Sequence, residues 1–205
     1  RDAQESRGLG DVYKRQPSNM GFDINIAGGP NGAPGSYLGI KNFGEGSPFA
    51  VKGLEKYHGQ DIFLTEALTI EAIKEMKKAV NEKMPFYLYM SHYAVHTPIE
   101  DDKRFSNNYR GQYDRQLKSK LGEKEAKYAA LVEGMDKSLG DIMDYIQSDP
   151  KLAQNTIILF MSDNGGQALG YCREGVPNRD PNYPARAGKL SLIHISEPTR
   201  LLSIS

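Results

Sequence analysis

Two stretches of the chain repeat apolar residues at the spacing of one helix face. The first, over residues 64–82, places Leu and Ile among Lys and Glu residues. The second, over residues 123–147, carries a longer apolar stripe with charged residues on the other face. The stripe consists of Tyr128, Leu131, Val132, Met135, Leu139, Ile142, Met143 and Ile146. Both patterns predict amphipathic helices that bury one face.

Two short apolar runs predict buried strands. The run "PFYLYMSHY", residues 85–93, follows the first helix, and "NTIILFMSD", residues 155–163, follows the second. Helices alternating with strands are typical of an α/β fold with a layered sheet. We therefore predict a central sheet sandwiched by helices, with these two strands as neighbours. Ligands of such folds bind beyond the carboxyl ends of the strands.

The segment before the first helix predicts a loop. Residues 28–39, "GGPNGAPGSYLG", are rich in Gly and Pro and show no periodicity. We expect an ordinary surface loop here, and the alternative is a loop near the pocket mouth that touches substrate.

The composition is that of a soluble globular domain, with 39% hydrophobic residues, 25% charged residues and a net charge of +0 over 205 residues. A neutral balance gives no reason to expect nucleic acid as a partner. No apolar run approaches the roughly 18 residues of a membrane span. The single cysteine, Cys172, excludes a disulfide within the chain.

The second predicted strand ends in "DNGG", in which Asp163 and Asn164 are followed by two glycines. Carboxylate and amide oxygens suit a hard cation such as Ca²⁺ or Mg²⁺. The same four residues are also common in turns, so a turn without a metal remains an alternative.

The first predicted strand is followed by "HTP", which begins at His96. A histidine at a strand end can donate a hydrogen bond to an anion or transfer a proton near neutral pH. It can equally bond a backbone carbonyl and have no catalytic role. His92, on the strand itself, is interpreted as structural.

Four stretches in this order carry a family resemblance: "PFYLYMSHYAVHTPI", "YAALVEGMDKSLGDIMDYI", "NTIILFMSDNGG" and "NYPARAGK". The series closely resembles the sulfatases, the formylglycine-dependent sulfuric ester hydrolases of the alkaline phosphatase superfamily. The resemblance implies hydrolysis of sulfate esters, with a sulfated small molecule or glycan as substrate and Ca²⁺ as cofactor. It also implies a periplasmic or extracellular location.

The resemblance also implies roles for individual residues. Asp163 and Asn164 match the second half of the family's Ca²⁺ site, and His96 matches the histidine on the leaving-group side of the sulfate. Lys189, in "RAGK", matches a lysine that binds a sulfate oxygen, although an exposed loop lysine is the alternative. Catalysis and substrate binding are thus expected of His96 and Lys189.

Other parts of the family pattern have no counterpart in this sequence. Cys172 is followed by "REGVP", which does not fit the C-x-P-S-R segment that becomes formylglycine. We therefore expect an internal fragment that lacks the N-terminal strands, the C-terminal subdomain and the signal peptide, and that is inactive alone. Two alternatives remain: a phosphatase, phosphodiesterase or phosphonate hydrolase of the same superfamily, or a non-catalytic domain that binds sulfated glycans.

Both ends of the chain are expected to be foreign. Residues 6–16, "SRGLGDVYKRQ", and 190–200, "LSLIHISEPTR", can be encoded by complementary strands of one DNA segment, which resembles a sequencing adapter. The expected division is residues 1–16 and 190–205 derived from adapter, with residues 17–189 forming a partial sulfatase catalytic domain.

Overall fold

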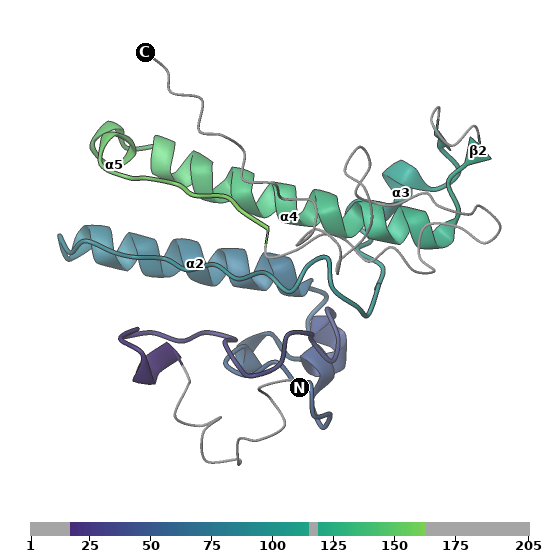
Figure 1. The fold of residues 1–205 in the computed structure, drawn as a ribbon, viewed down its shortest axis with the longest axis horizontal. Coiled ribbons are helices and arrows are strands. Elements are labelled where there is room, and N and C mark those ends of the chain that lie inside the picture. The colour runs from purple at the N-terminus through teal and green to yellow at the C-terminus, as the bar shows by residue number, and fades with distance from the viewer. Residues whose placement is uncertain (1–16, 115–118, 163–205) are drawn as a thin grey trace, which may run out of the picture.

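The computed structural model describes residues 17–114 and 119–162, and two long helices dominate it (Figure 1). Helix α2, Leu64–Asn81, and helix α4, Glu123–Gln147, match the two predicted helices closely. They pack against each other. The shorter elements are α3 (Ser106–Tyr109), α5 (Pro150–Gln154) and three 3₁₀ turns, Pro17–Asn19, Gly39–Gly44 and Glu55–Tyr57. None of the helices in these residues combines the length and apolar content of a membrane span.

Small residues on α4 allow its neighbours to approach closely. The buried positions of α4 are Ala126, Ala130, Leu131, Gly134, Ser138, Ile142 and Ile146. A Cβ at Gly134 would lie 3.1 Å from the Asp102 carboxylate, and the Thr69 hydroxyl of α2 donates to Ser138 at 2.6 Å. The buried face therefore holds fewer large apolar residues than the sequence predicted, and Val132 is 41% exposed.

The N-terminal part of the described chain, residues 17–62, packs below α2 in Figure 1 without long helices or strands. Tyr37, Phe43 and Leu54 are fully buried in a cluster that also includes residues at the start of α2. The surface-loop prediction for residues 28–39 is therefore wrong for its second half. Ser36 and Tyr37 are both buried: the Tyr37 ring stacks on Phe63, with ring centroids 5.2 Å apart, and the Ser36 hydroxyl donates to Glu100 at 2.6 Å.

The two predicted strands do not appear as strands in the described residues. Residues 85–93 and 155–162 form no ladder there, so the expected central sheet is not observed. The strands that the structure describes are β1, Tyr113–Asp114, and β2, Ser119–Lys120, which pair antiparallel. A strand exists only through hydrogen bonds to a neighbour, and neither apolar run has such a neighbour among these residues.

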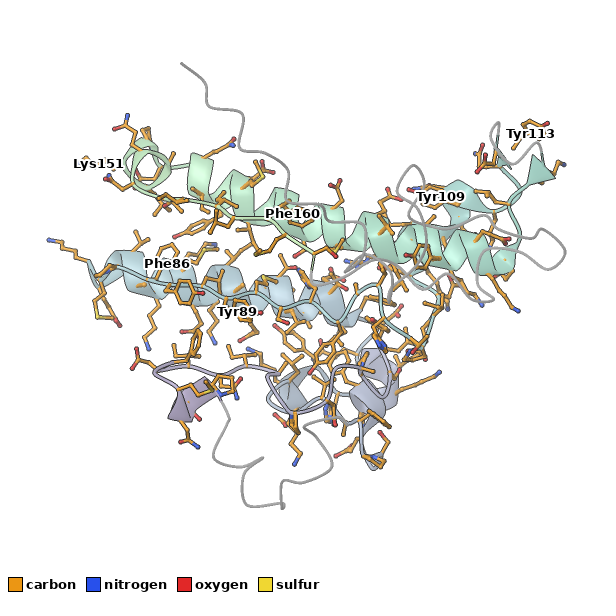
Figure 2. All side chains as sticks on the ribbon, viewed as in Figure 1. Phe86, Tyr89, Tyr109, Tyr113, Lys151 and Phe160 are labelled. Atoms are coloured by element: carbon orange, nitrogen blue, oxygen red, sulfur yellow. The ribbon has the colours of Figure 1, made fainter. Side chains whose placement is uncertain are left out.

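Residues 85–93 nevertheless alternate in exposure as a strand would. Phe86 and Met90 pack against a cluster that includes Ile142 of α4, and in Figure 2 Phe86 lies between the two long helices. Tyr87 and Tyr89 are 77% and 70% exposed. The segment thus covers the helices with one face and leaves the other open, as a strand of a sheet layered on helices does.

Candidate functional site

His96 lies in a tight turn that follows residues 85–93. The His96 amide donates to the Tyr93 carbonyl at 2.8 Å and closes the turn. The apolar residues around it, including Val95 and Ile99, pack against the buried cluster beneath. The turn is therefore seated on the core, and the His96 side chain itself is only partly buried.

The imidazole of His96 is held through one of its two nitrogens. Nδ1 lies 3.1 Å from the Thr97 carbonyl and 3.2 Å from the Thr97 hydroxyl. Because a carbonyl only accepts, the first contact requires a proton on Nδ1. Nε2 makes no hydrogen bond within residues 17–114 and 119–162.

The loop before α2 contacts this turn directly. The Tyr37 hydroxyl lies 2.9 Å from the His96 carbonyl and 2.7 Å from the Tyr93 carbonyl. Glu100, just beyond the turn, accepts from the Tyr37 amide at 2.6 Å. Sequence reasoning missed both residues, because no local pattern connects positions so distant along the chain.

His92 lies in a buried polar network, as its structural interpretation expected. Its Nε2 is 3.0 Å from the Ser138 hydroxyl, which also accepts from Thr69. Nδ1 is buried with no hydrogen-bond partner in the part of the chain that the structure describes. Burial lowers the pKa of His92 to about 4, since an imidazolium would lose its hydration. His92 is thus neutral at neutral pH.

The remaining predicted site residues, Asp163, Asn164 and Lys189, lie outside the described residues. Within residues 17–114 and 119–162, no group of three or more His, Cys, Asp or Glu side chains is arranged to hold a metal ion. The metal and lysine assignments therefore stay predictions, and the geometry on which the candidate site depends is that of the His96 turn.

Comparison with protein families shows which family the chain that carries this turn belongs to. The sulfatase family model matches residues 8–191, which is most of the chain. The chain belongs to the sulfatase family. The match includes His96 and also the positions of Asp163, Asn164 and Lys189.

Curated relatives carry the same family name. The chain is 26% identical to "Uncharacterized sulfatase PB10D8.02c" of Schizosaccharomyces pombe, over 87% of this chain and 40% of the relative. It is 31% identical to "Uncharacterized sulfatase YdeN" of Escherichia coli, over 73% of this chain and 24% of the relative. This sulfatase chain thus spans well under half the length of these relatives.

Solved structures show the likeness at the level of the fold. The crystal structure of Ps i-CgsB superposes with a TM-score of 0.52 at 24% sequence identity, covering 75% of this chain and 35% of that chain. A second crystal structure, of Ps i-CgsB in complex with k-i-k-neocarrahexaose, gives a TM-score of 0.51. Over the part of the chain that is covered, this sulfatase chain therefore shares the fold of Ps i-CgsB.

Proposed function

We propose that this chain is part of a longer sulfatase that hydrolyses sulfate esters of carbohydrates. The observation that carries the proposal is the sulfatase family match over residues 8–191. Two further findings support a sugar substrate. N-acetylgalactosamine-6-sulfatase of Canis lupus familiaris is 28% identical over 56% of this chain. A Ps i-CgsB structure of the same fold holds k-i-k-neocarrahexaose.

His96 is proposed to act on the leaving group. As the S–O bond of a sulfate ester breaks, negative charge develops on the departing oxygen. Nδ1 is engaged with Thr97, which leaves Nε2 to face the ester. A protonated Nε2 would donate to the departing oxygen as a general acid or as a hydrogen-bond donor. Lys189 is proposed to bind a sulfate oxygen through its ammonium group.

Asp163 and Asn164 are proposed to supply part of a Ca²⁺ site. Their carboxylate and amide oxygens fit this hard cation in donor type, but Ca²⁺ takes about six to eight oxygens. The remaining ligands are proposed to come from other parts of the longer protein. A bound Ca²⁺ would supply positive charge next to the sulfate.

The nucleophile is proposed to be a formylglycine that lies outside this chain, since Cys172 does not fit the motif. Residues 17–189 are proposed to form a partial catalytic domain, and residues 1–16 and 190–205 are proposed to derive from adapter sequence. The 205-residue chain alone is proposed to be inactive. The longer protein is proposed to act in the periplasm or outside the cell.

The test is to recover the longer gene, express it with the formylglycine-generating enzyme, and compare an aryl sulfate with an aryl phosphate as substrate. We expect sulfate turnover to exceed phosphate turnover by at least about 100-fold. Preferred hydrolysis of the phosphate would support a phosphatase of the same superfamily. Binding of sulfated glycan without any turnover would support a non-catalytic domain.

Metal content tests the calcium assignment separately. Asp163→Ala is expected to lower both the bound Ca²⁺ per protein and the turnover, because it removes a charged ligand. Asp144→Ala, on the exposed face of α4, is the matched control and should change neither. Equal Ca²⁺ content in the two variants would contradict the assignment.

A further inference from the structure

The turn that carries His96 accepts hydrogen bonds from one buried tyrosine, Tyr37, which lies far away along the chain. The Tyr37 hydroxyl lies within hydrogen-bond distance of two carbonyls, 2.7 Å from that of Tyr93 and 2.9 Å from that of His96. A hydroxyl has one proton, so the two carbonyls share it in a three-centre hydrogen bond. Burial of Tyr37 raises its pKa far above its usual value, and the hydroxyl stays protonated as a donor.

The chain just beyond this turn is held by the carboxylate of Glu100. Glu100 accepts hydrogen bonds from the Tyr37 amide and the Ser36 hydroxyl, both at 2.6 Å. It also pairs with the Lys41 ammonium at 2.7 Å. The stretch Ser36 to Lys41 therefore contacts both ends of the segment from Tyr93 to Glu100. The Tyr37 hydroxyl contacts Tyr93 and His96 at one end of this segment, and the Tyr37 amide contacts Glu100 at the other.

These contacts leave a single polar atom of His96 without a partner among the described residues. The His96 amide donates to Tyr93 and its carbonyl accepts from Tyr37. Nδ1 contacts Thr97. Only Nε2 remains. Its position is set by the His96 backbone and by Nδ1, and both of these are held by hydrogen bonds. This is the preorganised arrangement that a group acting on a bound substrate requires.

We propose that Tyr37 and Glu100 are positioning residues, which hold the His96 turn so that Nε2 meets the sulfate ester. The inference rests on the proposed function of His96. Neither residue touches the substrate in this account; both act through the placement of the imidazole. The buried half of the loop formed by residues 28–39 thus acts by holding the His96 turn and does not line the active site.

The decisive variant removes only the hydrogen bond from the Tyr37 hydroxyl to the His96 turn. Tyr37→Phe keeps the ring stacked on Phe63 but takes the donor from the two carbonyls. In the longer sulfatase, we expect kcat for an aryl sulfate to fall about 10- to 100-fold, since a small misplacement of a catalytic group costs rates of this order. KM should change little, so that kcat and kcat/KM fall together.

Tyr57→Phe is the matched control. The Tyr57 hydroxyl also makes a short hydrogen bond, to Glu71 at 2.6 Å, but it does not contact the His96 turn. Its kcat should equal that of the wild type. If Tyr37→Phe does not fold, Glu100→Gln provides the test. Its single amide oxygen cannot replace the carboxylate for three donors, and we expect about a tenfold loss of kcat.

A spectroscopic readout separates failure of this inference from failure of the proposed function. In protein with ¹³C-labelled histidine, the His96 Cε1–Hε1 signal is assigned by its loss in His96→Ala. We expect this signal to shift or broaden in Tyr37→Phe and to stay unchanged in Tyr57→Phe. If His96→Ala keeps wild-type turnover, the proposed role of His96 fails, and the signal still tests the positioning.

Three results would overturn the positioning role. The first is an inactive His96→Ala together with a folded Tyr37→Phe that retains wild-type kcat. The second is an unchanged His96 signal in Tyr37→Phe. A loss of kcat in Tyr37→Phe that is matched by Tyr57→Phe would likewise indicate general destabilisation and contradict the proposal.

Discussion

His92 and His96 lie on one segment, but their surroundings give them different chemistry. His92 is half-buried, and its Nε2 contacts Ser138 of α4 at 3.0 Å. His96 is seated on the core, and its Nε2 makes no hydrogen bond within the part of the chain that the structure describes. A buried imidazole resists protonation because the charge would lose its hydration. His92 therefore contributes to stability, and the candidate chemistry belongs to His96.

The lowered pKa of His92 predicts a pH dependence of stability. The pKa is about 4 in the folded chain and about 6.5 when unfolded. Below about pH 6.5 the unfolded chain binds the proton first, so stability is lost as the pH falls towards about 4. The expected loss in the free energy of unfolding is about 3 kcal/mol.

Urea unfolding of the longer protein between about pH 7 and pH 4.5 measures this loss. His92→Gln cannot titrate, so its free energy of unfolding should fall less steeply over that range than that of the wild type. Identical slopes for the two proteins would show that His92 is not held neutral by its surroundings.

At the scale of elements, the apolar pattern within one segment predicted the two long helices, but it did not predict the contacts between distant segments. The apolar periodicity places α2 and α4 correctly, because helix hydrogen bonds form within one segment. A strand depends on a distant partner, and residues 85–93 show alternating exposure without one. The hydrogen bond from the Tyr37 hydroxyl to the His96 carbonyl likewise joins residues that are far apart along the chain. The sequence could therefore single out His96 as a candidate, whose role stays a prediction, but it could not indicate which residues contact its turn.

The loop that carries Tyr37 depends on the close approach of two glycines. Gly44 has φ +82°, and a Cβ there would lie 2.5 Å from the Gly35 Cα and 2.9 Å from the Ser36 nitrogen. Gly46 has the same φ but open space around it. Comparing alanine at these two positions therefore separates backbone strain from crowding.

Gly46→Ala should cost about 1 kcal/mol of unfolding free energy, the penalty of a left-handed backbone for a residue with a Cβ. Gly44→Ala should cost about 1–3 kcal/mol more, since the loop must shift to admit the methyl group. Denaturant unfolding of both variants is the measurement. Equal costs would mean that the Gly35–Gly44 contact is not tight.

At the scale of the whole molecule, two apolar segments lie open to solvent. Residues 157–161 are exposed throughout, with Ile157 at 88% and Leu159 at 84%. Tyr87 and Tyr89 are also exposed, next to Phe22, and Figure 2 places Phe160 on the segment that runs along α4. Apolar surface of this extent favours association.

The 205-residue chain alone is therefore expected to self-associate. Replacing two exposed residues, Ile157→Lys with Leu159→Lys, should shift the chain towards the monomer in sedimentation velocity. The matched control is Gln147→Lys with Gln154→Lys, which adds the same two positive charges at exposed polar positions and should not shift it. A monomeric wild-type chain would contradict this expectation.

The most direct measurement of the central claim is turnover of an aryl sulfate by the longer sulfatase in which His96 is replaced by alanine. If His96 donates to the departing oxygen as proposed, its loss should lower kcat about 100- to 10,000-fold. His58→Ala, at a loop histidine whose Nδ1 lies 3.7 Å from Glu45, is the control and should keep wild-type kcat. A folded His96→Ala protein with the same kcat as His58→Ala would contradict the account.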